Sequence, residues 1–176
     1  FNTFTIILAL GSMPLAFSYP LMKRYTYWPQ FFLGISFNYG LILGWVCITN
    51  HIELVAIILY IGAIFWTLGF DTIYGYQDIK DDEIIGVKST SIKFKENPKL
   101  FLTICYSIFM ISLIMIGFFM KFNSIFYTFL AIPMLHLFLY QIYNLDFKDP
   151  KSSLKIFKSN NLLGAIVFLN ILIGKV

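Results

Sequence analysis

The sequence predicts an all-α integral membrane protein, a bundle of helices that cross the bilayer. Hydrophobic residues make up 59% of the 176 residues, charged residues make up 12%, and the mean hydropathy is +0.77. A soluble domain carries about a quarter of its residues as charged side chains, so this composition argues against one. The apolar residues also gather in runs that approach the length a helix needs to cross a membrane.

Six apolar runs are candidate spans, and short polar or lysine-containing segments separate them. Several are shorter than the ~20 residues a span usually needs, and the final run is the weakest candidate. The runs are Thr3–Leu21, Phe31–Ile48, Leu54–Phe70, Leu100–Met120, Ile125–Tyr143 and Asn161–Ile173.

Basic residues are distributed unevenly between the two ends of these spans. Eleven of the 13 lysines and arginines fall in segments 23–24, 80–99 and 148–158, which alternation places on one side of the membrane. The positive-inside rule predicts that this side faces the cytoplasm. Because these membrane-flanking residues account for the net charge of +4, the charge does not indicate a nucleic-acid partner.

Five of the nine acidic residues lie together on the basic side, directly after the third apolar run. Carboxylates at a membrane boundary are costly unless they are paired or bind a ligand, so the cluster is a candidate functional site. If the third helix continues past Phe70, Asp71 and Gly75 lie on one helical face. Asp78 and Asp82 follow on that same face, one turn apart. Two carboxylates at this spacing repel each other, and a divalent cation removes the repulsion.

Two interpretations of the acidic segment remain open from these residues. Carboxylates together with substrate phosphates are the usual ligands of Mg²⁺, which predicts a Mg²⁺–diphosphate site at the membrane edge. The alternative is a solvated loop whose acids balance the nearby lysines. A second unusual segment, residues 19–30, holds Lys23 and Arg24 at the end of the first run. Such a pair commonly anchors topology, and it can also bind a carboxylate or a phosphate.

Together the two segments resemble a known family. From Tyr19 the first is Tyr-Pro-x-Met-Lys-Arg-x-Thr-x-x-Pro-Gln-x-x-Leu-Gly. From Leu68 the second is Leu-Gly-Phe-Asp-Thr-Ile-Tyr-x-x-Gln-Asp-x-x-Asp-Asp-x-x-x-Gly-x-Lys-Ser-Thr. These motifs closely resemble the UbiA superfamily of intramembrane prenyltransferases, and most nearly its 4-hydroxybenzoate polyprenyltransferases of ubiquinone biosynthesis.

The resemblance implies a fold, a reaction and a cofactor. The fold is a nine-helix membrane bundle in a bacterial or mitochondrial inner membrane, with its Asp-rich loops on the cytoplasmic or matrix side. The reaction transfers a polyprenyl group from polyprenyl diphosphate to the ring of 4-hydroxybenzoate, with Mg²⁺ as cofactor. Carried over to this sequence, Asp78, Asp82 and Asp81 would hold the metal. Asp71 and Tyr74 would take catalytic positions, with Asp71 as ligand, base or orienting group.

The resemblance also implies substrate-binding roles. Lys23 and Arg24 match the family's Lys-Arg pair, with Arg24 a candidate partner for the benzoate carboxylate or the diphosphate. Lys88 stands where a diphosphate contact is expected. Asn38 matches a polar position in the next span, where it either contacts substrate or bonds to another helix.

The chain departs from the family pattern in one respect. The family's first motif, of the type Asn-Asp-x-x-Asp-x-x-x-Asp, is absent from the sequence, and six spans are found where the family has nine. We therefore expect residues 1–176 to form a single prenyltransferase domain whose N-terminal part is missing. The alternatives are an inactive fragment, a prenyltransferase with another aromatic acceptor, and a cation or metabolite transporter. Acids at a span end weigh against a transporter, which keeps its polar groups near the bilayer midplane.

Overall fold

The computed structural model describes residues 2–175, and over that range it contains helices and no strand. Six helical segments in it are long and apolar enough to cross a membrane, which confirms the predicted all-α membrane bundle. In chain order the elements are α1 (Thr3–Ser18), η1 (Tyr19–Leu21), α2 (Met22–Tyr25), α3 (Pro29–Thr49), α4 (Leu54–Gly75), α5 (Ile79–Ile85), α6 (Thr90–Lys93), α7 (Pro98–Phe119), α8 (Ser124–Phe129), α9 (Ala131–Leu135), η2 (His136–Ile142) and α10 (Pro150–Lys175).

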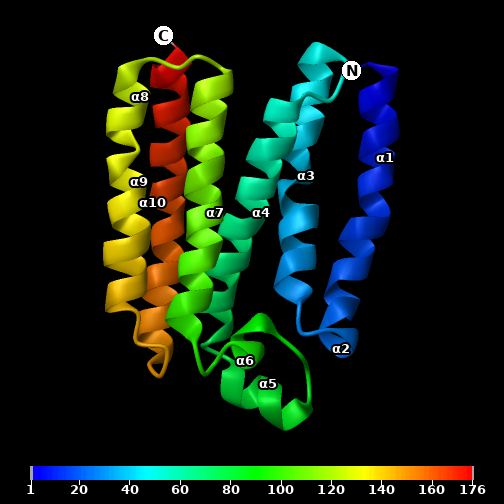
Figure 1. Cartoon of the computed structure of the whole chain (residues 1–176). Coiled ribbons are helices and arrows are strands. Elements are labelled where there is room, and N and C mark those ends of the chain that lie inside the picture. The colour runs from blue at the N-terminus through cyan, green and yellow to red at the C-terminus, as the bar shows by residue number, and fades with distance from the viewer. Residues whose placement is uncertain (1, 176) are drawn as a thin grey trace.

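Helix α4 occupies the middle of the bundle. It packs against α3 on one side and against α7 and α10 on the other. The short helices α5 and α6 lie together at one end of the bundle, and α2 ends at that same level (Figure 1). The polar segments that carry both sequence motifs therefore gather at one end.

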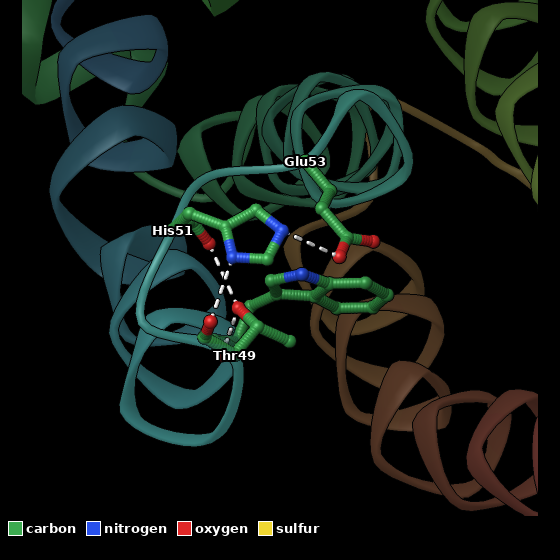
Figure 2. Close-up of polar contacts among 4 residues, drawn as sticks. Thr49, His51 and Glu53 are labelled. Atoms are coloured by element: carbon green, nitrogen blue, oxygen red, sulfur yellow. Dashed lines mark hydrogen bonds and ion pairs between the residues drawn. The ribbon is translucent and has the colours of Figure 1, made fainter.

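The opposite turn, between α3 and α4, is held by its own side chains. Asn50 takes the left-handed backbone conformation that ends α3, with φ 63°. Figure 2 shows His51 between Thr49 and Glu53: its Nε2 lies 2.9 Å from a Glu53 carboxylate oxygen, and its Nδ1 lies 2.7 Å from the Thr49 carbonyl oxygen. His51 therefore stabilises a turn remote from the acidic cluster.

Small residues let α4 approach its neighbours closely. A Cβ added to Gly69 would stand 2.5 Å from the ring of Tyr106 on α7, and one added to Gly62 would collide with Ser112. On the other side, Gly34 of α3 leaves space for the backbone of Ile64, 3.0 Å from the site of its missing Cβ. Small residues at helix interfaces are the usual means of close packing inside a membrane.

A buried network of polar side chains joins four elements in the middle of the bundle. The Tyr106 hydroxyl of α7 donates to Gln141 Oε1 of η2 at 2.6 Å, and Gln141 Nε2 donates to Asn160 Oδ1 of α10 at 3.0 Å. The Trp66 indole of α4 donates to the same Asn160 oxygen at 2.9 Å. We name Trp66, Tyr106, Gln141 and Asn160 the mid-bundle network. Each of these four side chains is hydrogen-bonded to another of them, as is usual for buried polar groups.

Two boundaries differ from the sequence prediction. The last span begins at Pro150 rather than Asn161, so most of segment 148–158 is helix rather than a connection. Its lysines lie on the exposed face of α10. The buried face was not recognised in the sequence because its first residue, Ser153, is polar. The buried residues over this stretch and the next two turns are Ser153, Ile156, Asn160, Leu163 and Val167.

The second difference is that α4 ends at Gly75, so the acidic segment is not one continuous helix. A turn follows, in which the Tyr76 N–H bonds to the Ile73 carbonyl at 3.2 Å and the Asp78 N–H bonds to the Gly75 carbonyl at 3.3 Å. Helix α5 begins directly after Asp78. The turn redirects the chain across the end of the bundle.

Candidate functional site

A cavity of about 190 Å³ lies at the end of the bundle where α2, α3, α4 and α5 meet. Both sequence motifs contribute to it, although the first ends at Gly34 and the second begins only at Leu68. Five of the predicted site residues line it, together with residues that sequence reasoning did not single out. The lining is Tyr19, Pro20, Lys23, Pro29, Gln30, Leu33, Asp71, Tyr74, Gly75, Asp78 and Asp82.

The turn after α4 keeps three acids at this cavity. Asp71 projects from the last turns of α4, Asp78 directly precedes α5, and Asp82 lies in the first turn of α5. The Asp82 N–H bonds to the Asp78 carbonyl at 2.8 Å, so these two residues remain one helical turn apart. The expected spacing between Asp78 and Asp82 therefore holds, although the single helix from Asp71 does not.

Asp82 is the most buried of the three acids, with 9% of its surface exposed. Burial raises the pKa of its carboxyl group, Lys23 opposes that change, and the neighbouring Asp78 and Asp81 add to it. Within residues 2–175 no ion pair forms to any of the three cavity acids. The nearby Glu83 instead pairs with Lys95 at 2.8 Å. The cavity thus concentrates negative charge that a cation would stabilise.

The beginning of α3 also lines the cavity, and segment 89–91 is hydrogen-bonded to it. Gln30, in the first turn of α3, is only 4% exposed, and its Oε1 accepts a hydrogen bond from the Thr90 N–H at 3.0 Å. Thr90 also shares a hydroxyl–hydroxyl bond with Thr72 at 2.6 Å, and Ser91 donates to the Thr72 carbonyl at 2.8 Å. These bonds fasten segment 89–91 to α4 and fix the Gln30 side chain.

Four of the predicted site residues lie outside the cavity lining. Arg24 and Asp81 are exposed at the surface. Lys88 donates through Nζ to the Tyr25 carbonyl at 3.3 Å, and its backbone N–H bonds to the Lys23 carbonyl at 2.8 Å. Lys88 therefore ties the loop after α5 to the segment that carries Lys23.

Asn38 lies deeper, between two spans. Its amide donates to the Gly34 carbonyl at 2.8 Å, to Thr67 Oγ1 at 2.8 Å and to the Ala63 carbonyl at 3.2 Å. Of the two roles expected for Asn38, the structure shows the bond to another helix. Asn38 also lines a second cavity of about 360 Å³, which lies about one turn of α3 further from the end of the bundle.

The residues missed by sequence reasoning are mainly in the first motif. Tyr19, Pro20, Pro29 and Gln30 all belong to it, yet only the charged pair of that motif was assigned a role. The only sequence signal for Gln30 was its place directly after Pro29, and that signal does not reveal its burial. Proline favours the first position of a helix, so the residue after it lies in the first turn.

The carboxylates of this cavity fit a magnesium ion that is shared with a substrate. Within the described chain no group of three His, Cys, Asp or Glu side chains is arranged to hold a metal by itself. Mg²⁺ is commonly bound by one or two carboxylates, with substrate phosphates and waters completing its shell. Asp78 and Asp82 supply two carboxylates to one cavity. The arrangement suits a Mg²⁺–phosphate complex rather than an all-protein metal cage.

Comparison with known proteins gives a consistent result. Residues 1–171 match the UbiA prenyltransferase family. The chain is 42% identical to the mitochondrial 4-hydroxybenzoate polyprenyltransferase of Bos taurus, over 98% of this chain and 47% of that protein. It is 41% identical to 4-hydroxybenzoate geranyltransferase 2 of Lithospermum erythrorhizon, over 99% of this chain and 57% of that protein. The chain thus spans about half the length of these curated relatives. No solved structure matches it.

Proposed function

Because this chain belongs to the UbiA prenyltransferase family, we propose that it transfers a polyprenyl group from polyprenyl diphosphate to the ring of 4-hydroxybenzoate, as a step of ubiquinone biosynthesis. The relatives that support it are named for the transfer of a polyprenyl or a geranyl group to 4-hydroxybenzoate. The observation that carries the proposal is the cavity itself. It brings the acids of the second motif and Lys23 of the first to one place at the end of the bundle.

Asp78 and Asp82 are the residues that would hold Mg²⁺ with the diphosphate, because they present carboxylates one turn apart to the same cavity. When bound, the metal would neutralise charge on the diphosphate as it leaves. Lys23 lines the same space and acts as a point charge on the phosphates. Asp81 lies at the surface, where it adds negative charge beside Asp82 rather than acting as a metal ligand.

The transfer breaks the bond between the prenyl C1 and the diphosphate oxygen and forms a bond from C1 to the ring carbon ortho to the phenol hydroxyl. That ring carbon then loses its proton. We assign the proton to Asp71, the remaining cavity carboxylate, which lies half-buried at the end of α4. The neighbouring Tyr74 ring faces the developing positive charge on the prenyl group, since aromatic faces attract cations.

An aromatic path leads from this cavity toward the middle of the bundle and suits the apolar prenyl chain. The Tyr74 and Phe157 ring centroids are 4.8 Å apart, and those of Phe157 and Phe70 are 5.8 Å apart. Phe70 and Phe157 also line the second cavity, with Trp66 further along α4. The diphosphate would then remain at the membrane edge while its hydrocarbon chain lies among aromatic rings.

The position of the site in the membrane follows from the lysines. We propose that the cavity end faces the cytoplasm or the mitochondrial matrix, in the bacterial or mitochondrial inner membrane, because most basic residues lie at that end. Residues 1–176 would form one domain, since α4 packs against spans on both sides of it.

Prenyl transfer in membranes tests the proposal. The host is a strain that lacks its own 4-hydroxybenzoate prenyltransferase, supplied with polyprenyl diphosphate, radiolabelled 4-hydroxybenzoate and Mg²⁺. The chain is assayed alone and joined to the part of the bovine relative that the alignment does not cover. We expect labelled, lipid-soluble product that disappears when EDTA removes the metal. Absence of product from both proteins contradicts the proposed function.

A further inference from the structure

The first turn of α3 faces the cavity with an unusual polar group. Pro29 and Gln30 both line the cavity, and α3 extends from them for 21 residues. The beginning of a helix carries partial positive charge from its free N–H groups and its dipole. The acids lie on other elements, α4 and α5, so the cavity has an acidic wall and, apart from it, the first turn of α3 with the amide of Gln30.

The hydrogen bonds of Gln30 fix which end of its amide is free. Its Oε1 accepts from the Thr90 N–H, and exchanging the amide oxygen and nitrogen would set two donors against each other. Its Nε2 donates to no acceptor within residues 2–175. That nitrogen lies 3.5 Å from the position a Cβ would take on Gly75, which lines the cavity from α4. A side chain that is more than nine-tenths buried thus presents two free N–H donors toward the cavity.

The two substrates of the proposed reaction carry one anionic group each. Mg²⁺ on the acidic wall would bind the diphosphate, because this ion prefers phosphate oxygens. The carboxylate of the aromatic acid then needs a receptor of its own, and amide donors beside a helix N-terminus are well suited to one. Arg24, the other candidate for that carboxylate, is exposed and lies outside the cavity lining.

We propose that Gln30 binds the carboxylate of the aromatic acceptor through Nε2, aided by the first turn of α3, and so selects an acidic acceptor. Thr90 is the positioning residue, because its N–H holds the Gln30 oxygen away from the substrate. Gly75 leaves room for both neighbouring side chains, since a Cβ there would collide with Ser91 and stand 3.5 Å from Gln30 Nε2. This inference rests on the proposed function, and it adds the group that recognises the acceptor.

Replacing Gln30→Glu tests the inference with little change of shape. The substitution retains an oxygen that accepts from Thr90 and places a carboxylate where Nε2 stood. We expect KM for 4-hydroxybenzoate to rise roughly tenfold or more, as for loss of a hydrogen bond to a charged group, while KM for the prenyl diphosphate stays within about twofold. With 4-hydroxybenzamide as acceptor the preference should reverse, because its NH₂ group can donate to the new carboxylate. Asn144→Asp is the matched control, since it adds the same charge at an exposed position near the end of η2.

The outcomes separate the inference from the proposed function. If KM for the prenyl diphosphate rises instead, Gln30 contacts the diphosphate and the inference is wrong. If neither KM moves, Gln30 contacts no substrate, and the inference is again wrong. If even the unchanged protein gives no product, the proposed function fails, and equilibrium dialysis with radiolabelled 4-hydroxybenzoate decides the inference separately. Binding that Gln30→Glu weakens and Asn144→Asp retains supports the carboxylate site, and equal binding to all three proteins overturns it.

Discussion

The cavity at the end of the bundle and the mid-bundle network contain similar polar side chains but differ in how those side chains are paired. In the network, Gln141 is fully buried, and its amide oxygen and nitrogen both bond to protein groups. In the cavity, Asp82 is nearly buried without an ion pair in the described chain, and the Gln30 nitrogen has no protein acceptor there. A buried polar group without a partner is costly, so a ligand that supplies partners to Asp82 and Gln30 would be stabilised in the cavity. The network is thus expected to serve stability and the cavity to serve binding.

The largest expected effect is on catalysis, from Asp78→Ala or Asp82→Ala. Each removes a carboxylate that would hold Mg²⁺ with the diphosphate, an interaction worth several kcal/mol in the transition state. We expect prenyl transfer to fall by roughly 100-fold or more. Circular dichroism should show unchanged helix content. Activity within a few-fold of normal in either variant would remove that residue from the metal site.

Gln141→Leu should have its main effect on stability. The substitution leaves the Tyr106 hydroxyl without its acceptor and removes one donor from Asn160, both in the interior of the bundle. Unfolding free energy should fall by about 1–3 kcal/mol, the cost of leaving buried polar groups unpaired. Thermal unfolding in detergent measures this loss. An unchanged unfolding midpoint would show that the network contributes nothing to stability.

Gly69→Ala should lower stability by a similar or smaller amount. Its new methyl group would stand 2.5 Å from the Tyr106 ring, so α4 and α7 would have to separate. Overpacking of this kind typically costs about 1–3 kcal/mol. Gly40→Ala is the control, because no atom lies within 4 Å of the position its Cβ would take. Equal unfolding midpoints for the two variants would contradict the close packing of α4 on α7.

The smallest expected effect separates two neighbouring basic residues. Both residues are exposed, but Arg24 lies outside the cavity lining, so Arg24→Ala should change KM and kcat by no more than about threefold. Lys23→Ala should weaken transfer more, since Lys23 lines the cavity and lowers the pKa of Asp82. Kinetic assays with both substrates compare them. A larger loss from Arg24→Ala would restore the substrate-binding role that the sequence suggested for Arg24.

The sequence predicted the fold class and the cluster of acids because both depend on local composition. Long apolar runs require spans, and carboxylates after a span stand out whatever their neighbours do. The start of α10 was missed because the lysines of its first turns suggested a connection, whereas Ser153 and Asn160 face the interior. Gln30 could not be ranked from the sequence, since its role depends on Thr90, which is distant in the chain.

Thermal unfolding with and without prenyl diphosphate and Mg²⁺ tests most directly whether unpaired polar groups mark the binding site. Asp82→Asn and Gln141→Leu are compared with the unchanged protein. We predict that Asp82→Asn unfolds near the normal midpoint but is no longer stabilised by the ligand pair. We predict that Gln141→Leu unfolds at a lower temperature and keeps the full ligand-induced rise. If Asp82→Asn retains the ligand-induced rise, or if Gln141→Leu alone loses it, the division between a binding cavity and a structural network is wrong.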